Sequence, residues 1–136
     1  MTLVKLSAAC KSKNMMLDWN EYLKELKTTI GEIGHISPDV TRGYATLANA
    51  GAKTGKLDAK TRELIALAVG VSLRCDGCIT VHTTEAIKNG ATKEEIIEAL
   101  GVAISVNAGA ALVYSARVLD AYAAKTAPQD AAPLLK

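Results

Sequence analysis

Signals for the start of a helix recur along the whole chain, and no stretch between them alternates apolar and polar residues convincingly enough to predict a β-strand. Four short polar residues of the kind that cap helices each precede apolar residues at helical spacing: Asp18, Ser37, Asp58 and Thr92. A further helix opens at the pair Cys75–Cys78. The sequence therefore predicts an all-α fold, a compact bundle of about five to seven helices.

The same signals give approximate bounds for the helices. We expect them over about 18–33, from Ser37 to the glycine-marked stretch 49–55, from Asp58 to about Leu73, from Cys75 to Asn89–Gly90, and from Thr92 to about Ala124. Gly101 and Gly109 interrupt the last pattern, so we expect that helix to be bent or broken between them. Residues 1–15, expected to be disordered, and 126–136 are predicted tails on either side of one helical domain over 16–125.

Composition limits the partners and the compartment that we expect. Apolar residues make up 49% of the chain but aromatic residues only 4%, so the core must be built mostly from aliphatic side chains. The 16 basic and 14 acidic residues are interleaved, which leaves no basic face for a nucleic acid. The three cysteines are an odd number with a spacing unlike a secreted disulfide framework, so we expect a cytoplasmic protein.

One segment, 99–116, has the length at which a membrane-spanning helix must be considered, because its eighteen residues carry no formal charge. It contains Ser105, Asn107 and Ser115, and most of its other members are small. We therefore expect a helix that is buried in a soluble bundle or at a subunit interface, and no membrane contact.

The stretch from Arg74 to His82 is the densest in reactive side chains. On a helix, Cys75, Cys78 and His82 occupy positions i, i+3 and i+7 of one face, and the imidazole is close enough to exchange a proton with the second thiol. Unpaired backbone N–H groups in the first turn stabilise a thiolate. The arrangement supplies an activated nucleophile, a base and a resolving thiol.

Two other interpretations of this cluster stay open. A Cys-x-x-Cys pair also occurs in zinc sites, where Cys75, Cys78 and His82 would need a fourth ligand from among Cys10, His35 and an acid such as Glu63. No second ligand pair with zinc-site spacing is present in the sequence, however. The cysteines could also be inert structural residues. A thioredoxin-like fold is rejected because it requires a strand before the motif.

The combination of Glu63, Cys75-x-x-Cys78, His82 and the turn "NGATKEEI" resembles the alkyl hydroperoxidase D core of the carboxymuconolactone decarboxylase family. The resemblance covers about residues 57–125, which would form the redox core of the domain. It implies an all-helical fold and assembly as a homo-oligomer, a trimer or a hexamer.

The resemblance also implies roles for individual residues. Cys78 would attack a hydroperoxide and Cys75 would resolve the product into a disulfide, while His82 would relay protons and Glu63 would orient His82. The expected activity is thus that of a thiol-dependent peroxidase or disulfide oxidoreductase, which is restored by an external dithiol or a reductase protein. No glycine-rich dinucleotide fingerprint is present in the sequence, so we expect no cofactor in this chain.

One position departs from the family pattern. Alkyl hydroperoxidase D itself has a histidine immediately before the second cysteine, where this chain has Gly77. The proton relay would therefore be shorter, although dithiol exchange would remain possible. A decarboxylase acting on a lactone through His82 is one alternative, which the cysteine pair argues against; a non-catalytic zinc or redox-sensing module is another.

Overall fold

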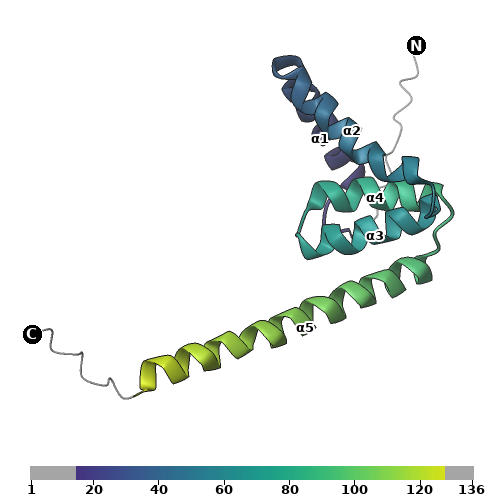
Figure 1. Cartoon of the computed structure of the whole chain (residues 1–136). Helices are drawn as coiled ribbons and strands as arrows, with labels where there is room; N and C mark the ends of the chain where they lie inside the picture. Colours follow the sequence, from purple (N-terminus) through teal and green to yellow (C-terminus); the bar gives the residue numbers. More distant parts are fainter. Residues whose placement is uncertain (1–14, 128–136) are drawn as a thin grey trace, which may run out of the picture. The chain divides into compact units, whose positions relative to one another are not determined.

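The computed structural model describes residues 15–127, which form five α-helices and no strand. The helices are α1 (Trp19–Ile36), α2 (Pro38–Thr54), α3 (Ala59–Ser72), α4 (Asp76–Lys88) and α5 (Lys93–Thr126) (Figure 1). The predicted all-α class and the expected number of helices are both confirmed. The two predicted tails stay predictions, because nearly all of their residues lie outside the described range. Only residues 15, 126 and 127 of the tails are described.

The chain divides into two compact units, and the boundary between them in the sequence falls between Lys53 and Thr54 at the end of α2. The first unit contains α1 and nearly all of α2, and the second contains α3, α4 and α5. All four residues predicted to act in catalysis belong to the second unit. Its internal packing therefore determines the geometry of the candidate site.

Helices α1 and α2 begin where the sequence predicts. The carboxylate of Asp18 accepts a hydrogen bond from the Glu21 N–H at 3.2 Å, and Pro38 is the first residue of α2. Helix α1 continues to Ile36, three residues beyond the predicted end. Neither helix has a fully buried residue, and the exposed apolar side chains include Ile36, Val40, Tyr44 and Leu47.

In the second unit, α3 packs against both α4 and α5. The buried residues at these contacts are mostly small: Leu67 and Gly70 of α3, Thr80 and Ala86 of α4, and Ala103 of α5. Small side chains let helix backbones approach closely, as the composition suggested. Asn107 of α5 adds a polar contact, because its amide donates to the Ser72 hydroxyl of α3 at 2.7 Å.

Polar contacts fix the first turns of α3 and α5. Asp58 caps α3 by accepting the Thr61 N–H at 2.8 Å, while Thr92 and Glu95 form a capping box at the start of α5. The Lys60 ammonium of α3 lies 2.6 Å from the Glu95 carboxylate of α5. This hydrogen-bonded ion pair raises the pKa of Lys60 and lowers the pKa of Glu95, and the Thr92 backbone N–H lowers the latter further.

Helix α5 is one continuous helix of 34 residues, so the predicted bend or break between Gly101 and Gly109 is wrong. Both glycines have helical backbone conformations, since neither has a positive φ. A glycine inside a helix costs only about 1 kcal/mol relative to alanine, and the alanines and leucines around these two positions favour helix. At 1.5 Å per residue the helix is about 50 Å long.

Most of α5 is exposed in the single chain. Only Ala103 is buried, and the exposed large apolar side chains on this helix are Ile97, Val102, Ile104, Val106, Leu112, Val113, Tyr114, Val118, Leu119 and Tyr122. By length and composition alone α5 could cross a membrane, with a mean hydropathy of 1.9 over an eighteen-residue window that is 6% buried. The expectation that 99–116 is buried within the chain's own bundle is therefore wrong, whereas burial at a subunit interface stays a prediction.

Candidate active site

The connection between α3 and α4 reverses the chain in three residues, Leu73 to Cys75. The Arg74 N–H donates to the Val71 carbonyl and the Cys75 N–H donates to the Gly70 carbonyl, both at 3.0 Å. These two bonds form a Schellman motif, in which the residue after the helix cap takes a left-handed conformation. That residue is Arg74, with φ of 55°, whereas Gly90 fills the equivalent position after α4 with φ of 80°.

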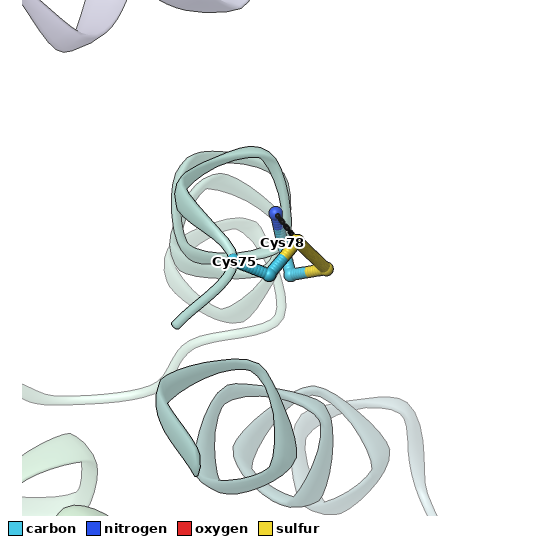
Figure 2. The surroundings of a disulfide bond; sticks show 2 residues. All are labelled: Cys75 and Cys78. Atoms are coloured by element: carbon cyan, nitrogen blue, oxygen red, sulfur yellow. Dashed lines mark hydrogen bonds between the residues drawn. A yellow bond between two sulfur atoms is a disulfide. The ribbon is translucent and has the colours of Figure 1, made fainter. Parts of the chain in front are cut away.

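Cys75 ends this turn and at the same time caps α4. Its sulfur accepts the Cys78 N–H at 3.1 Å, in the position where Ser, Thr or Asp usually caps a helix. The sulfur atoms of Cys75 and Cys78 are joined in a disulfide, with their Cα atoms 5.2 Å apart (Figure 2). Both residues are partly exposed. After reduction, two thiols would lie at the positive end of the α4 dipole, which favours a thiolate.

Glu63 of α3 and His82 of α4 form the second part of the candidate site. The carboxylate oxygen Oε2 of Glu63 lies 2.7 Å from Nδ1 of His82. The two side chains are 21% and 31% exposed, so solvent only partly screens this contact. An ionised carboxylate can only accept, so Nδ1 carries the hydrogen and Nε2 is free to accept a proton. His82 follows Cys78 by four residues and shares its face of α4.

The structure thus brings the four predicted residues into one pair of packed helices: Glu63 meets His82, and Cys75 meets Cys78. Gly77 lies in the first turn of α4, where it has no side chain that could extend a proton relay. Two features were missed from the sequence, namely the left-handed Arg74 and the contacts of Gly70 with the cysteines. Nothing in "GVSLRC" marks either of them, because glycine is the usual signal for such a turn.

Among the described residues, those considered as zinc ligands do not form a metal-binding group. Between residues 15 and 127, no group of three or more His, Cys, Asp or Glu side chains is arranged to hold a metal ion. His82 pairs with Glu63 instead, and His35 lies near the end of α1 in the other unit. Cys10 lies outside the described residues.

An apolar groove of about 380 Å³ runs between α3 and α5. Its walls are Ile65, Ala68, Val69, Ser72, Leu73, Val102, Ala103, Val106 and Asn107. Several of these side chains, among them Val69, Leu73 and Val106, are more than half exposed in the single chain. The groove therefore continues the exposed apolar surface of α5.

Comparison with known sequences places the chain in a family. The model of the carboxymuconolactone decarboxylase family matches residues 38–121. An uncharacterized protein of Haemophilus influenzae is 48% identical over 113 residues, which are 83% of this chain and all of that protein. The protein called "Uncharacterized protein 4 in cox locus" of Paracoccus denitrificans is 32% identical over 97 residues, 71% of this chain and 87% of its own length.

Solved structures show the same relationship. A carboxymuconolactone decarboxylase family protein from Legionella pneumophila matches with a TM-score of 0.63 and 38% identity, covering 76% of this chain and 93% of that one. A protein from Methanobacterium thermoautotrophicum matches with a TM-score of 0.57 and 29% identity, over 74% and 97% of the two chains. The resemblance inferred from the sequence is thereby confirmed. The chain belongs to the carboxymuconolactone decarboxylase family and has its alkyl hydroperoxidase D-like fold.

Proposed function

We propose that this protein is a thiol-dependent peroxidase or disulfide oxidoreductase of alkyl hydroperoxidase D type. The observation that carries the proposal is the Cys75–Cys78 disulfide in the first turn of α4. The Glu63–His82 hydrogen bond between α3 and α4 supports it. The dithiol that forms when this disulfide is reduced can give two electrons to a peroxide, and the oriented imidazole on the same face of α4 can transfer the protons.

The first step is oxidation of Cys78. Its thiolate attacks one oxygen of a hydroperoxide, so that an S–O bond forms while the O–O bond breaks. Two electrons pass from the sulfur to the peroxide, and the leaving oxygen takes a proton to become an alcohol, or water when the substrate is hydrogen peroxide. Cys78 is left as a sulfenic acid.

The second step closes the disulfide. The Cys75 sulfur attacks the Cys78 sulfur, the S–S bond forms, and the S–O bond breaks to release hydroxide, which leaves as water with the proton of the Cys75 thiol. An external dithiol then reduces the disulfide by two exchange reactions and becomes a disulfide itself. That dithiol, or a reductase protein, is the required partner, and this chain needs no cofactor of its own.

His82 moves the protons in this scheme. The Glu63 carboxylate holds the Nδ1 hydrogen, so Nε2 accepts the proton of the Cys78 thiol and later returns one to the leaving oxygen. Glu63 also stabilises the imidazolium that forms. Because Gly77 adds no second imidazole, His82 alone carries all proton transfer. Disulfide exchange with a protein partner is an equally suitable task for the Cys75–Cys78 pair.

The exposed apolar surface supports a homo-oligomer, a trimer or a hexamer. Contiguous apolar surface of this extent on a soluble chain marks an interaction site. Here it includes most of α5 beyond Ala103 and the groove between α3 and α5. We infer that further copies of the chain cover this surface in a cytoplasmic assembly without membrane contact. Nucleic acid has no role in the proposal.

Steady-state turnover with an organic hydroperoxide and excess dithiol tests the function. The wild-type protein should consume the hydroperoxide, Cys78→Ser should be inactive, and Cys75→Ser should react once with the peroxide and then stop. Cys10→Ser is the matched control, and it should keep full activity. Full activity in Cys78→Ser would refute the scheme, whereas a wild-type protein that consumes no hydroperoxide would direct the search to lactone decarboxylation around His82.

A further inference from the structure

Helix α4 approaches α3 closely at Gly70. A Cβ atom added to Gly70 would lie 3.0 Å from the Cβ of Cys78 and 3.9 Å from the Cys78 carbonyl carbon and the Ile79 nitrogen. At 3.0 Å the first of these contacts is tighter than nearly all that real Cβ atoms make, and the atoms involved are not the far ends of flexible side chains. A side chain at position 70 would therefore require Cys78 to shift by a few tenths of an ångström.

Gly70 contacts the other cysteine through a different atom. Its carbonyl oxygen accepts the Cys75 N–H at 3.0 Å, the longer-range bond of the Schellman motif. One residue of α3 thus holds the backbone of Cys75 and also limits how closely Cys78 approaches. Glu63, the other α3 residue in the candidate site, lies two turns earlier and contacts His82.

We propose that Gly70 is a positioning residue that sets the equilibrium between the dithiol and disulfide forms of the Cys75–Cys78 pair. The inference rests on the proposed function, since it concerns the redox pair of that reaction. A side chain at position 70 would push Cys78 away from α3, while the hydrogen bond to the Gly70 carbonyl would hold Cys75 in place. The separation and direction of the two Cβ–Sγ bonds would then change.

This change affects the two redox forms unequally. A disulfide requires matching Cβ directions as well as a suitable Cα separation, which is 5.2 Å here, and a displaced Cys78 Cβ changes those directions. Two free thiols have no such requirement, so they tolerate the shift. Substituting Gly70 should therefore destabilise the disulfide relative to the dithiol and make the pair easier to reduce.

Three other helical glycines have no such contact. Nothing lies within 4 Å of a Cβ added to Gly43, Gly101 or Gly109. Alanine at an open helical position stabilises a helix, because glycine loses more conformational freedom on folding. Gly43→Ala in the exposed part of α2 is therefore the matched control: it is the same substitution in a helix, distant in sequence from the cysteines.

The test is a redox titration in glutathione buffers. At each ratio of reduced to oxidised glutathione, free thiols are trapped by alkylation in acid and the Cys75–Cys78 peptide is measured by mass spectrometry. Gly70→Ala should change the equilibrium constant between the Cys75–Cys78 disulfide and its dithiol about tenfold in favour of the dithiol. This change corresponds to a shift of about 30 mV in the reduction potential of the pair. Gly43→Ala should titrate with the wild type.

The possible failures can be told apart. A wild-type protein that forms the disulfide normally, together with a Gly70→Ala variant that titrates at the same midpoint, overturns the inference alone. A wild-type protein that forms no disulfide in any buffer overturns the proposed function, and the inference with it.

A second measurement covers the case in which Gly70→Ala folds poorly. Thermal unfolding of the reduced proteins is compared in the native background and in a Cys78→Gly background, which lacks the Cβ that the new methyl group would meet. Gly70→Ala should lower the Tm in the native background and raise it in the Cys78→Gly background. Gly43→Ala should raise the Tm in both backgrounds. An equal loss in both backgrounds would overturn the inference, because the conflict would not be with Cys78.

Discussion

Glu63 Oε2 on α3 and His82 Nδ1 on α4 lie 2.7 Å apart, although nineteen positions separate the two residues in the chain. The contact exists because α3 and α4 pack side by side after the turn at Arg74 (Figure 1). It fixes the tautomer of the imidazole and leaves Nε2 as a proton acceptor on the face of α4 that also carries Cys78. In the proposed mechanism this pair transfers the protons and the cysteine pair transfers the electrons.

Substitutions at Glu63 and His82 should distinguish the loss of the base from the loss of the carboxylate charge that acts on it. His82→Ala should lower kcat/KM for an organic hydroperoxide by about 100-fold, because it removes the base. Glu63→Gln keeps a polar group beside Nδ1 but loses the negative charge, so we expect a smaller loss of about tenfold. Glu98→Gln, at an exposed carboxylate of α5, is the control and should leave kcat/KM unchanged. Wild-type kinetics in Glu63→Gln would remove this residue from the mechanism.

The backbone conformation of the turn before Cys75 predicts that a substitution at Arg74 should stabilise the protein. Arg74 has φ of 55°, a conformation that costs a residue with a side chain about 1 kcal/mol, and no such cost applies to glycine. Arg74→Gly should therefore increase the free energy of unfolding in urea by about 1 kcal/mol. The converse substitution, Gly90→Ala at φ of 80°, should decrease it by a similar amount. A loss of stability in Arg74→Gly would mean that the arginine side chain itself stabilises the fold.

The ion pair between Lys60 and Glu95 predicts how stability depends on pH. The hydrogen bond from Lys60 lowers the pKa of Glu95 in the folded state, so its stabilisation is complete above the ordinary value of 4.5 and is lost as the pH falls through the lowered pKa. The pKa of Lys60 is raised, so its contribution is complete below 10.5 and disappears as the pH rises through the raised pKa.

Urea unfolding of Glu95→Gln checks this dependence. Glutamine still serves the capping box, so the substitution removes mainly the charge. The variant should be less stable than the wild type at pH 7, and the difference should shrink as the pH falls below 4.5. Glu94→Gln, in the same turn of α5, is the control. A difference that stays constant between pH 7 and acid would show that the charge of Glu95 is not involved.

The apolar surface of α5 predicts the effect of a charge placed on it. Leu119 is 71% exposed in the single chain, and the proposed assembly would bury it. Leu119→Glu should reduce the molar mass measured by light scattering toward that of one chain, whereas Lys125→Glu on the same helix should leave the assembly intact. A wild-type protein that is monomeric in solution, or that requires detergent, would contradict the proposed subunit interface.

Local chemistry explains which parts of the fold could be predicted. Asp18, Asp58 and Thr92 each cap a helix through a backbone N–H three residues later, so the signal and the contact lie in the same short stretch. The bend expected in α5 was wrong because glycine only weakens a helix, and weak preferences are outweighed by the residues around them.

Long-range packing explains what the sequence left undetermined. As the partner of His82, Glu63 was predicted only through the family resemblance, because this contact depends on how α3 and α4 pack. The close approach at Gly70 has the same origin. The exposure of α5 was missed for a related reason: an uncharged helix rich in small residues has the same composition whether its own chain or another copy covers it.

The central claim is that Cys75 and Cys78 are a redox pair that a peroxide oxidises, and a thiol count tests it most directly. The reduced protein, as Cys10→Ser so that only these two thiols remain, is treated with one equivalent of an organic hydroperoxide. Free thiols are counted and the 75–78 peptide is examined by mass spectrometry. We expect rapid loss of both thiols, a Cys75–Cys78 disulfide and full recovery with a dithiol. Two unreacted thiols in the folded protein would contradict it.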